Sequence, residues 1–273
     1  MTSSAGMRRL GCLVGGLLFV QSSVVGAPSA LERIKAAGVV VICLDPDNLP
    51  YSHSKQTPPG FDVEISEWLA KELGVTAKFH WVDTIRDTAL GELLEGACDC
   101  APGTAIDTSA ADEMANLGEK VLFSWPYYST GYVVVTKDGG PQPKALAEVK
   151  DRKIGAEAGS VADYHLNLKG YDRRLYPRQE SIFSGLDSGE VTVGFMWAPN
   201  VGWMLKTDPQ LKFKLVDGYS PEPDFRWNVG VAVRKNDPDL KAALDTAIQK
   251  LVATQQAQRI IASYGAPYFA PFP

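Results

Sequence analysis

The chain has 273 residues, a formal net charge of −5 at pH 7 and 45% hydrophobic residues. This length is enough for two lobes with separate cores. The acidic balance, with no cluster of Lys or Arg, argues against nucleic acid or an anionic membrane surface as a partner. Small molecules and other proteins remain.

The first 26 residues have the pattern of a secretory signal peptide. Two arginines at positions 8 and 9 precede an apolar run over 10–20, and small residues then suit cleavage after Gly26 or Ala27. The apolar run is too short for a transmembrane anchor, and Cys12 lies too early in it for a lipid anchor. Removing the two arginines would change the net charge from −5 to −5 − 2 = −7. We therefore expect a soluble, periplasmic protein that is not embedded in a membrane.

A buried-type strand followed by a polar loop spans residues 39–60. Residues 39–43 are a near-continuous apolar run, typical of a strand covered on both faces. At its carboxyl end, where open α/β sheets bind ligands, four side chains are candidates for ligand contact: Asp45, Asp47, Asn48 and Tyr51. Two prolines stiffen the loop. Asp45 could instead cap a turn, and Tyr51 could belong to the core.

Helix and strand periodicities alternate through the first part of the mature chain. We predict helices at 31–37, 61–73 and 84–95, strands at 39–43 and 75–81, and a strand-like run that opens at Cys98. This order favours a mostly parallel sheet with right-handed crossovers. It is the plan of one α/β lobe.

The same alternation restarts after residue 141. We predict helices at 145–150, 161–168 and 181–188 and strands at 153–156, 174–177 and 191–197. Two further strands, 132–137 and 228–233, would cross between the lobes as an antiparallel pair, and a long helix over 238–263 would return to the first lobe. The prediction is a two-lobed α/β fold with mostly parallel sheets in each lobe, able to bend at a hinge. Its expected boundaries are 27–133 and 229–273 for lobe one and 134–228 for lobe two.

Three cysteines remain in the mature chain: Cys43, Cys98 and Cys100. An exported protein favours a disulfide, and an odd count leaves one thiol over. Because Cys43 lies on the first strand and Cys98 opens a run that commonly neighbours it, we favour a Cys43–Cys98 bond. Zinc binding is the alternative, but Cys-x-Cys without a nearby His does not match structural zinc spacing.

A series of short motifs resembles the extracellular solute-binding proteins of family 3, the amino-acid-binding type that serves ABC transporters. In chain order they are LERIKAAGVVVICLD, PPGFDVEI with LAKELG, LLEGACD with GTAI, FSWPYYSTG, IGAEAGS and VGVAVRKND. The resemblance covers essentially the whole mature chain, and it implies the periplasmic binding protein type II fold.

A narrower resemblance is to the MxaJ/XoxJ-type branch associated with pyrroloquinoline-quinone alcohol and methanol dehydrogenases. It depends on residues 43–52, 194–203 and 264–267. This resemblance implies periplasmic support of a quinoprotein dehydrogenase, through a small non-amino-acid ligand or through the enzyme itself. The alternative is a substrate-binding subunit of an ABC transporter for a small polar or amino-acid-like solute, with the permease as partner. We expect a monomer in either case.

The resemblance also implies a carboxylate clamp that this chain lacks. Family members usually carry an Arg a few residues after G-x-T-x, because a guanidinium binds a carboxylate bidentately. Here that position falls near Ala110, and no Arg lies between Arg86 and Arg152. The lobe-two acid that usually receives an amino group is replaced by Trp197. An ordinary amino acid is therefore not the expected ligand.

The remaining candidates for ligand contact come from both lobes. Besides the four loop residues they are Gly103, Thr104, Gly159, Ser160, Trp197 and Asn200. Backbone amides at the helix start after Gly159 could hold an anion or a carbonyl, whereas Ser160 is an N-cap in any case. Trp197 could instead fill the cleft and abolish ligand binding.

Catalysis and cofactor binding have no motif here. The chain has no G-x-S-x-G, no phosphate loop and no His, Cys, Asp or Glu cluster with metal-ligand spacing. The Asp-Pro-Asp-Asn order at 45–48 lacks the further Asp and Gly of a calcium loop. A dehydratase with this fold would need cations facing its dicarboxylate substrate, and the missing arginine near Ala110 argues against such a site. We predict neither an enzyme nor a cofactor or metal site.

Overall fold

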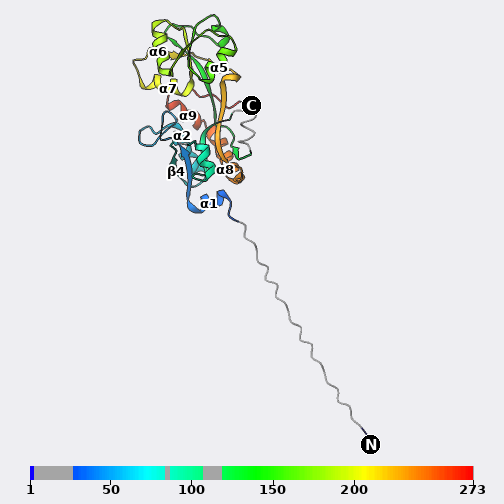
Figure 1. Cartoon of the computed structure of the whole chain (residues 1–273). Helices are drawn as coiled ribbons and strands as arrows, with labels where there is room; N and C mark the ends of the chain where they lie inside the picture. Colours follow the sequence, from blue (N-terminus) through cyan, green and yellow to red (C-terminus); the bar gives the residue numbers. More distant parts are fainter. Residues whose placement is uncertain (3–26, 84–86, 107–118, 273) are drawn as a thin grey trace.

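A computed structural model describes residues 1–2, 27–83, 87–106 and 119–272 (Figure 1). Residues 3–26 of the predicted signal peptide and the position near Ala110 lie outside these residues. Within them, no helix is long and apolar enough to cross a membrane.

The first part of the chain forms the predicted parallel sheet in the order β4-β1-β5. Helix α1 starts with a capping box between Ser29 and Glu32 and ends at Gly38, whose φ of 68° suits a glycine. The elements are α1 (Ala30–Ala37), β1 (Val39–Leu44), α2 (Phe61–Glu72), β4 (Thr76–Trp81), α3 (Ala89–Glu95) and β5 (Cys100–Ile106).

A second parallel set, in the order β10-β8-β9, forms the other lobe. Figure 1 shows its helices α5 and α6 in the upper half of the molecule, apart from α1 and β4 in the lower half, with α7 nearest the other lobe. The elements are η1 (Leu146–Val149), β8 (Ile154–Glu157), α5 (Val161–Leu168), β9 (Arg173–Tyr176), α6 (Gln179–Ser188), β10 (Val193–Trp197), α7 (Ala198–Thr207), β11 (Phe213–Leu215) and η2 (Pro223–Phe225). η1 is a 3₁₀ turn where we predicted a helix.

Two long strands join the lobes, as predicted. β7 (Tyr128–Lys137) pairs antiparallel with β12 (Arg226–Arg234) near its start and with β10 from Tyr132 onward, and β12 continues beside β5. The result is one path of strands, β4-β1-β5-β12-β7-β10-β8-β9. β6 (Val121–Phe123) adds to β12, and β11 adds to β7. The two-lobed α/β fold is confirmed.

The two lobes have separate hydrophobic cores. One combines α1, α2 and β1 with β12 and the helices near the C-terminus, and its buried residues include Ile34, Phe61 and Leu244. The other combines β7, β8 and β10 with α5, α6 and α7, and includes Val134 and Leu166. Helices cover the faces of each sheet, so inner strands such as β1 and β10 are apolar on both sides.

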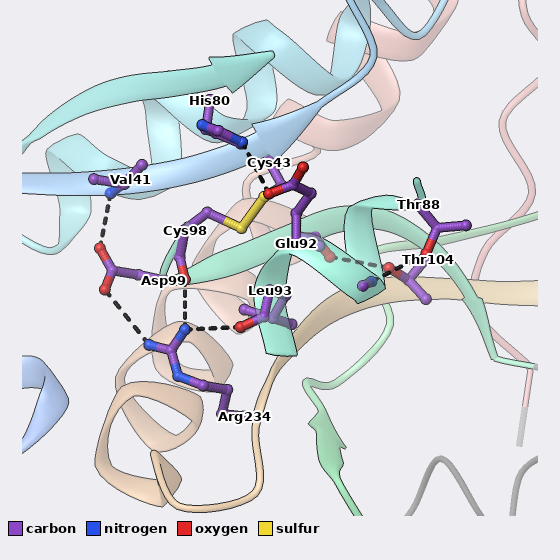
Figure 2. Close-up of a disulfide and its surroundings, with 12 residues drawn as sticks. Val41, Cys43, His80, Thr88, Glu92, Leu93, Cys98, Asp99, Thr104 and Arg234 are labelled. Atoms are coloured by element: carbon purple, nitrogen blue, oxygen red, sulfur yellow. Dashed lines mark hydrogen bonds and ion pairs between the residues drawn. A yellow bond between two sulfur atoms is a disulfide. The ribbon is translucent and has the colours of Figure 1, made fainter. Parts of the chain in front are cut away.

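The Cys43–Cys98 disulfide predicted from the sequence is present and leaves Cys100 free and buried. It joins β1 to the residues before β5, and Figure 2 shows Arg234 of β12 beside it. The guanidinium donates to the carbonyl oxygens of Leu93 (3.1 Å) and Cys98 (2.5 Å). Disulfide and arginine together tie β1, α3, β5 and β12 at one place.

Three local features differ from the sequence predictions. The predicted helix over 238–263 is two helices, α8 (Pro238–Ala253) and α9 (Gln256–Ser263), because Gln255 adopts a left-handed φ of 57°. Helix α7 was not predicted. Nor was the small hairpin of β2 (Asp47–Asn48) and β3 (Ser52–His53) inside the opening polar loop.

Candidate ligand site between the lobes

A pocket of about 630 Å³ lies between the crossing strands and the start of α5. From one side come Ile106 at the end of β5 and Arg226 and Trp227 on β12, with Phe272 of the C-terminal tail. From the other side come residues 159–161 and 164–165 around α5. Two of the predicted ligand residues, Gly159 and Ser160, therefore line this pocket.

One wall of the pocket is the start of α5, where hydrogen bonds of the N-cap fix the backbone. The Ser160 hydroxyl accepts from the Asp163 amide (3.2 Å), and the Asp163 carboxylate accepts from the Gly159 amide (3.0 Å). Burial raises the pKa of the Tyr132 hydroxyl, and the polar groups of Ser160 and the Ala162 amide beside it partly oppose that rise. Ser160 is thus an N-cap that also faces the pocket.

The opposite wall carries a cation. The Arg226 guanidinium lies 4.1 Å from the ring centre of Phe272. Its Nε atom is buried and has no hydrogen-bond partner among the described residues. The sequence analysis did not single out Arg226 or Phe272. The guanidinium is placed where an arriving anion could contact it.

Trp197 bridges the two lobes directly. Its indole Nε1 donates to the Tyr51 hydroxyl at 2.5 Å, and its backbone amide donates to Gln179 Oε1 at 2.9 Å. Burial raises the pKa of Tyr51, although the hydrogen bond from Trp197 opposes this. Trp197 also packs on Trp227, with ring centres 5.6 Å apart. Trp227 lines the pocket and Trp197 does not, so the indole of Trp197 fills the space toward Tyr51 and leaves the pocket beside Trp227 open.

A second contact between the lobes joins α7 to the C-terminal segment. Gly202 lies so close to Gly265 that a Cβ atom on Gly202 would meet the Gly265 carbonyl oxygen at 2.3 Å. Next to it, the rings of Trp203 and Tyr264 lie 5.8 Å apart. The three segments that carry the narrower resemblance, 43–52, 194–203 and 264–267, therefore meet in space.

Asp45, Asp47 and Asn48 of the opening loop do not line the pocket; Asp47 and Asn48 are exposed on the small hairpin, and half-buried Asp45 precedes it. The Asp45 carboxylate accepts a hydrogen bond from the Asp47 amide at 2.8 Å. Asp45 therefore caps a turn, which was the alternative to a role in ligand contact. Asp47 faces His53 at 3.2 Å with its side chain 86% exposed, and Asn48 pairs with Ser52 in the hairpin. Contact of these residues with a solute stays a prediction.

The remaining candidates do not line the pocket. The Gly103 amide donates to the Tyr127 hydroxyl (2.9 Å), and the Thr104 hydroxyl donates to the Ala101 carbonyl oxygen (3.0 Å). Asn200, on α7, has a buried Oδ1 atom with no partner among the described residues. Their role in binding also stays a prediction.

One buried carboxyl group was missed by the sequence analysis. Asp62, in the first turn of α2, is 3% exposed. Burial raises its pKa to about 7, although the Tyr127 hydroxyl donates to it at 3.0 Å. Because Tyr127 also accepts from the Gly103 amide, Asp62 is linked to the strand that leads to the pocket. The only sequence signal was an acid beside an apolar helix face.

No three side chains of His, Cys, Asp or Glu gather as a metal site would require, so far as the described ranges extend.

The model of the bacterial extracellular solute-binding proteins, family 3, matches residues 40–267. The chain belongs to this family.

Among curated proteins, this family member is 27% identical over 226 residues to the L-cystine-binding protein TcyJ of Escherichia coli K12, covering 81% of this chain and 80% of that protein. It is 28% identical over 211 residues to an L-arginine-binding protein of Pseudomonas aeruginosa, covering 75% and 78%. Among solved structures, the unliganded open L-cystine solute receptor of Neisseria gonorrhoeae superposes with a TM-score of 0.76 at 20% identity, covering 90% and 100%.

Proposed function

We propose that this protein is a periplasmic, non-enzymatic solute-binding protein that captures a small polar or amino-acid-like solute for an ABC permease. One observation carries the proposal: within a family 3 fold, a pocket of about 630 Å³ lies between the crossing strands and the N-terminus of α5. The curated relatives are named for binding cystine and arginine, which supports a solute of this class. The lobe boundaries 27–133, 134–228 and 229–273 belong to the same proposal.

The test is a ligand screen on the chain from residue 27 onward. L-cystine, L-arginine, the other amino acids and small organic acids are added singly while thermal unfolding is followed. We expect at least one solute to raise the midpoint by several degrees, because a ligand at 100 times its Kd stabilises the folded state by about 2.7 kcal/mol. If none does, the proposal is wrong.

A matched pair of tryptophan variants locates the binding. Trp227 lines the pocket, whereas Trp125 is 59% exposed and does not line it. Trp227→Ala should abolish the shift given by the active solute, and Trp125→Ala should keep it. The reverse result would place the solute elsewhere.

A second candidate function is support of a quinoprotein dehydrogenase, as the narrower resemblance implies. The contact of Trp197 with Tyr51 favours it, because this contact occupies part of the space between the lobes. Biolayer interferometry against a purified pyrroloquinoline-quinone methanol dehydrogenase tests this directly. Saturable binding would favour support of the enzyme. No binding, together with recovery of a permease from solubilised membranes, would favour transport.

A further inference from the structure

Arg226 supplies the guanidinium of the pocket wall. It starts β12, is half-buried and forms no ion pair among the described residues. Its guanidinium lies on the Phe272 ring at 4.1 Å, which orients the planar group without neutralising it. A buried guanidinium nitrogen without an acceptor is unfavourable unless a ligand supplies the acceptor.

Two acids at this pocket are already paired with other cations. Asp224 also lines the pocket, but its carboxylate lies 2.5 Å from the Lys169 ammonium. Asp163, at the start of α5, lies 2.6 Å from Arg173. Among the described residues that line it, the pocket therefore presents one guanidinium without an ion-pair partner and no carboxylate free to receive an ammonium group.

The rest of the lining is mostly apolar. Ile106, Val161, Tyr164 and Trp227 line the space, and the polar groups on the α5 side include the Ser160 hydroxyl and the His165 imidazole. Such a surface suits a hydrocarbon chain or ring with one charged end. A planar guanidinium fork matches a carboxylate bidentately.

We propose that Arg226 binds the carboxylate of a small organic acid whose hydrocarbon part lies against Trp227 and Tyr164, and that the site does not require an α-amino group. This inference rests on the proposed solute-binding function. It gives Arg226 the carboxylate-binding role of the family's usual arginine, which is missing near Ala110. It deepens that function by naming the ligand class as monocarboxylates with an apolar body.

The test compares ligands that differ at one group. Isothermal titration calorimetry uses 3-phenylpropanoate, its neutral amide and L-phenylalanine, and then 4-methylpentanoate, its amide and L-leucine. At least one of the two acids should bind, its amide at least tenfold more weakly, and its amino acid no more tightly than the acid. An amide that binds as well as its acid would overturn the inference.

Three arginine variants complete the test. R226Q should weaken the acid at least tenfold, and R226K should weaken it severalfold, because lysine keeps the charge but not the fork. R178Q is the matched control, since Arg178 is exposed and does not line the pocket. It should bind like the wild type. Circular dichroism checks that each variant is folded. If R226Q does not fold, R226K alone tests the role of the guanidinium.

The outcomes separate this inference from the function that it rests on. If an amino acid or cystine binds to the wild type and to R226Q with equal affinity, Arg226 does not bind the carboxylate. The proposed solute-binding function would still hold. If neither the acids nor any amino acid binds the wild type, both are wrong.

Discussion

At the scale of single residues, Asp62 should make stability depend on pH. Its folded-state pKa of about 7 lies above the ordinary value of 3.8 because the carboxyl is buried. A carboxyl with a raised pKa stabilises the folded state while protonated, so this contribution is complete below about pH 4 and is lost as pH rises through 7. The full span corresponds to about 4 kcal/mol in the free energy of unfolding.

Asp62→Asn isolates this effect because asparagine cannot ionise. Urea unfolding of wild type and variant between pH 4 and 8 should show the wild type losing stability relative to the variant as pH rises. Asp151→Asn, at an exposed position, is the control and should run parallel to the wild type. Parallel curves for D62N would contradict the buried-carboxyl interpretation.

Tyr51→Phe tests the hydrogen bond between the lobes. The substitution keeps the ring packed on Phe61, with centres 5.1 Å apart, and removes the acceptor of the Trp197 indole. We expect a loss of about 1 kcal/mol in the free energy of unfolding, measured with urea. Tyr164→Phe, whose residue is 61% exposed, should cost nothing measurable. Equal stability of Tyr51→Phe and wild type would count against the bond.

Local patterns could identify some site residues and not others. Ser160 follows a glycine before a helical repeat, so its N-cap position was predictable. Arg226 and Phe272 are 46 positions apart and meet only because the tail returns to β12. Asp62 looked like a solvent-facing acid in a first helical turn, but it is buried and bonded to Tyr127, which directly precedes β7. Tertiary contacts of this kind leave no periodic signal.

At the scale of elements, the disulfide should contribute most to the lobe that holds β1 and β5. It closes a loop with a sequence separation of 55. Cross-linking a loop of this length stabilises by about 4 kcal/mol in the chain-entropy model. The paired variant Cys43→Ala with Cys98→Ala should lose about that much in urea unfolding.

Cys100→Ala provides the comparison for this experiment, because Cys100 is buried but free. It removes a sulfur and leaves the cross-link. Its loss should be well below that of the double variant. Equal losses would mean that packing around the sulfurs, and not the cross-link, supplies the stability.

Most elements followed from periodicity, and the exceptions have tertiary causes. Helix α7 contains Pro199 and Gly202, which lower helix propensity, but the proline lies in the first turn, where its missing N–H costs nothing. Gly202 is needed for the contact with Gly265. The break at Gln255 separates two helices whose apolar positions continue across it, so the sequence predicts one helix. The left-handed residue is not a glycine, and no local signal marks it.

At the scale of the whole molecule, the contact of Gly202 with Gly265 sets how closely α7 approaches the other lobe. A Cβ atom there would meet backbone, which cannot move aside as a side chain does. Gly202→Ala should therefore lower the free energy of unfolding by about 1–3 kcal/mol, the usual cost of overpacking. Small-angle scattering should also show the lobes displaced.

Gly91→Ala is the matched control, also within a helix. Its Cβ atom would meet the end of the Asp87 side chain, which can rotate away. We expect it to be neutral or stabilising by up to about 1 kcal/mol, as alanine is in a helix. If Gly202→Ala behaves in the same way, the approach of the lobes is not limited by this contact.

The two hydrophobic cores differ in the span of sequence that contributes their buried residues. Buried residues of the α5–α7 core all lie between Tyr132 and Phe225, whereas the other core joins Ala30 and Ile34 to Ile260 and Ile261 near the opposite end. Bringing distant segments together is slower than forming contacts within one stretch. We expect the α5–α7 lobe to fold first, and the other core to lack α8 and α9 until the last part of the chain has arrived.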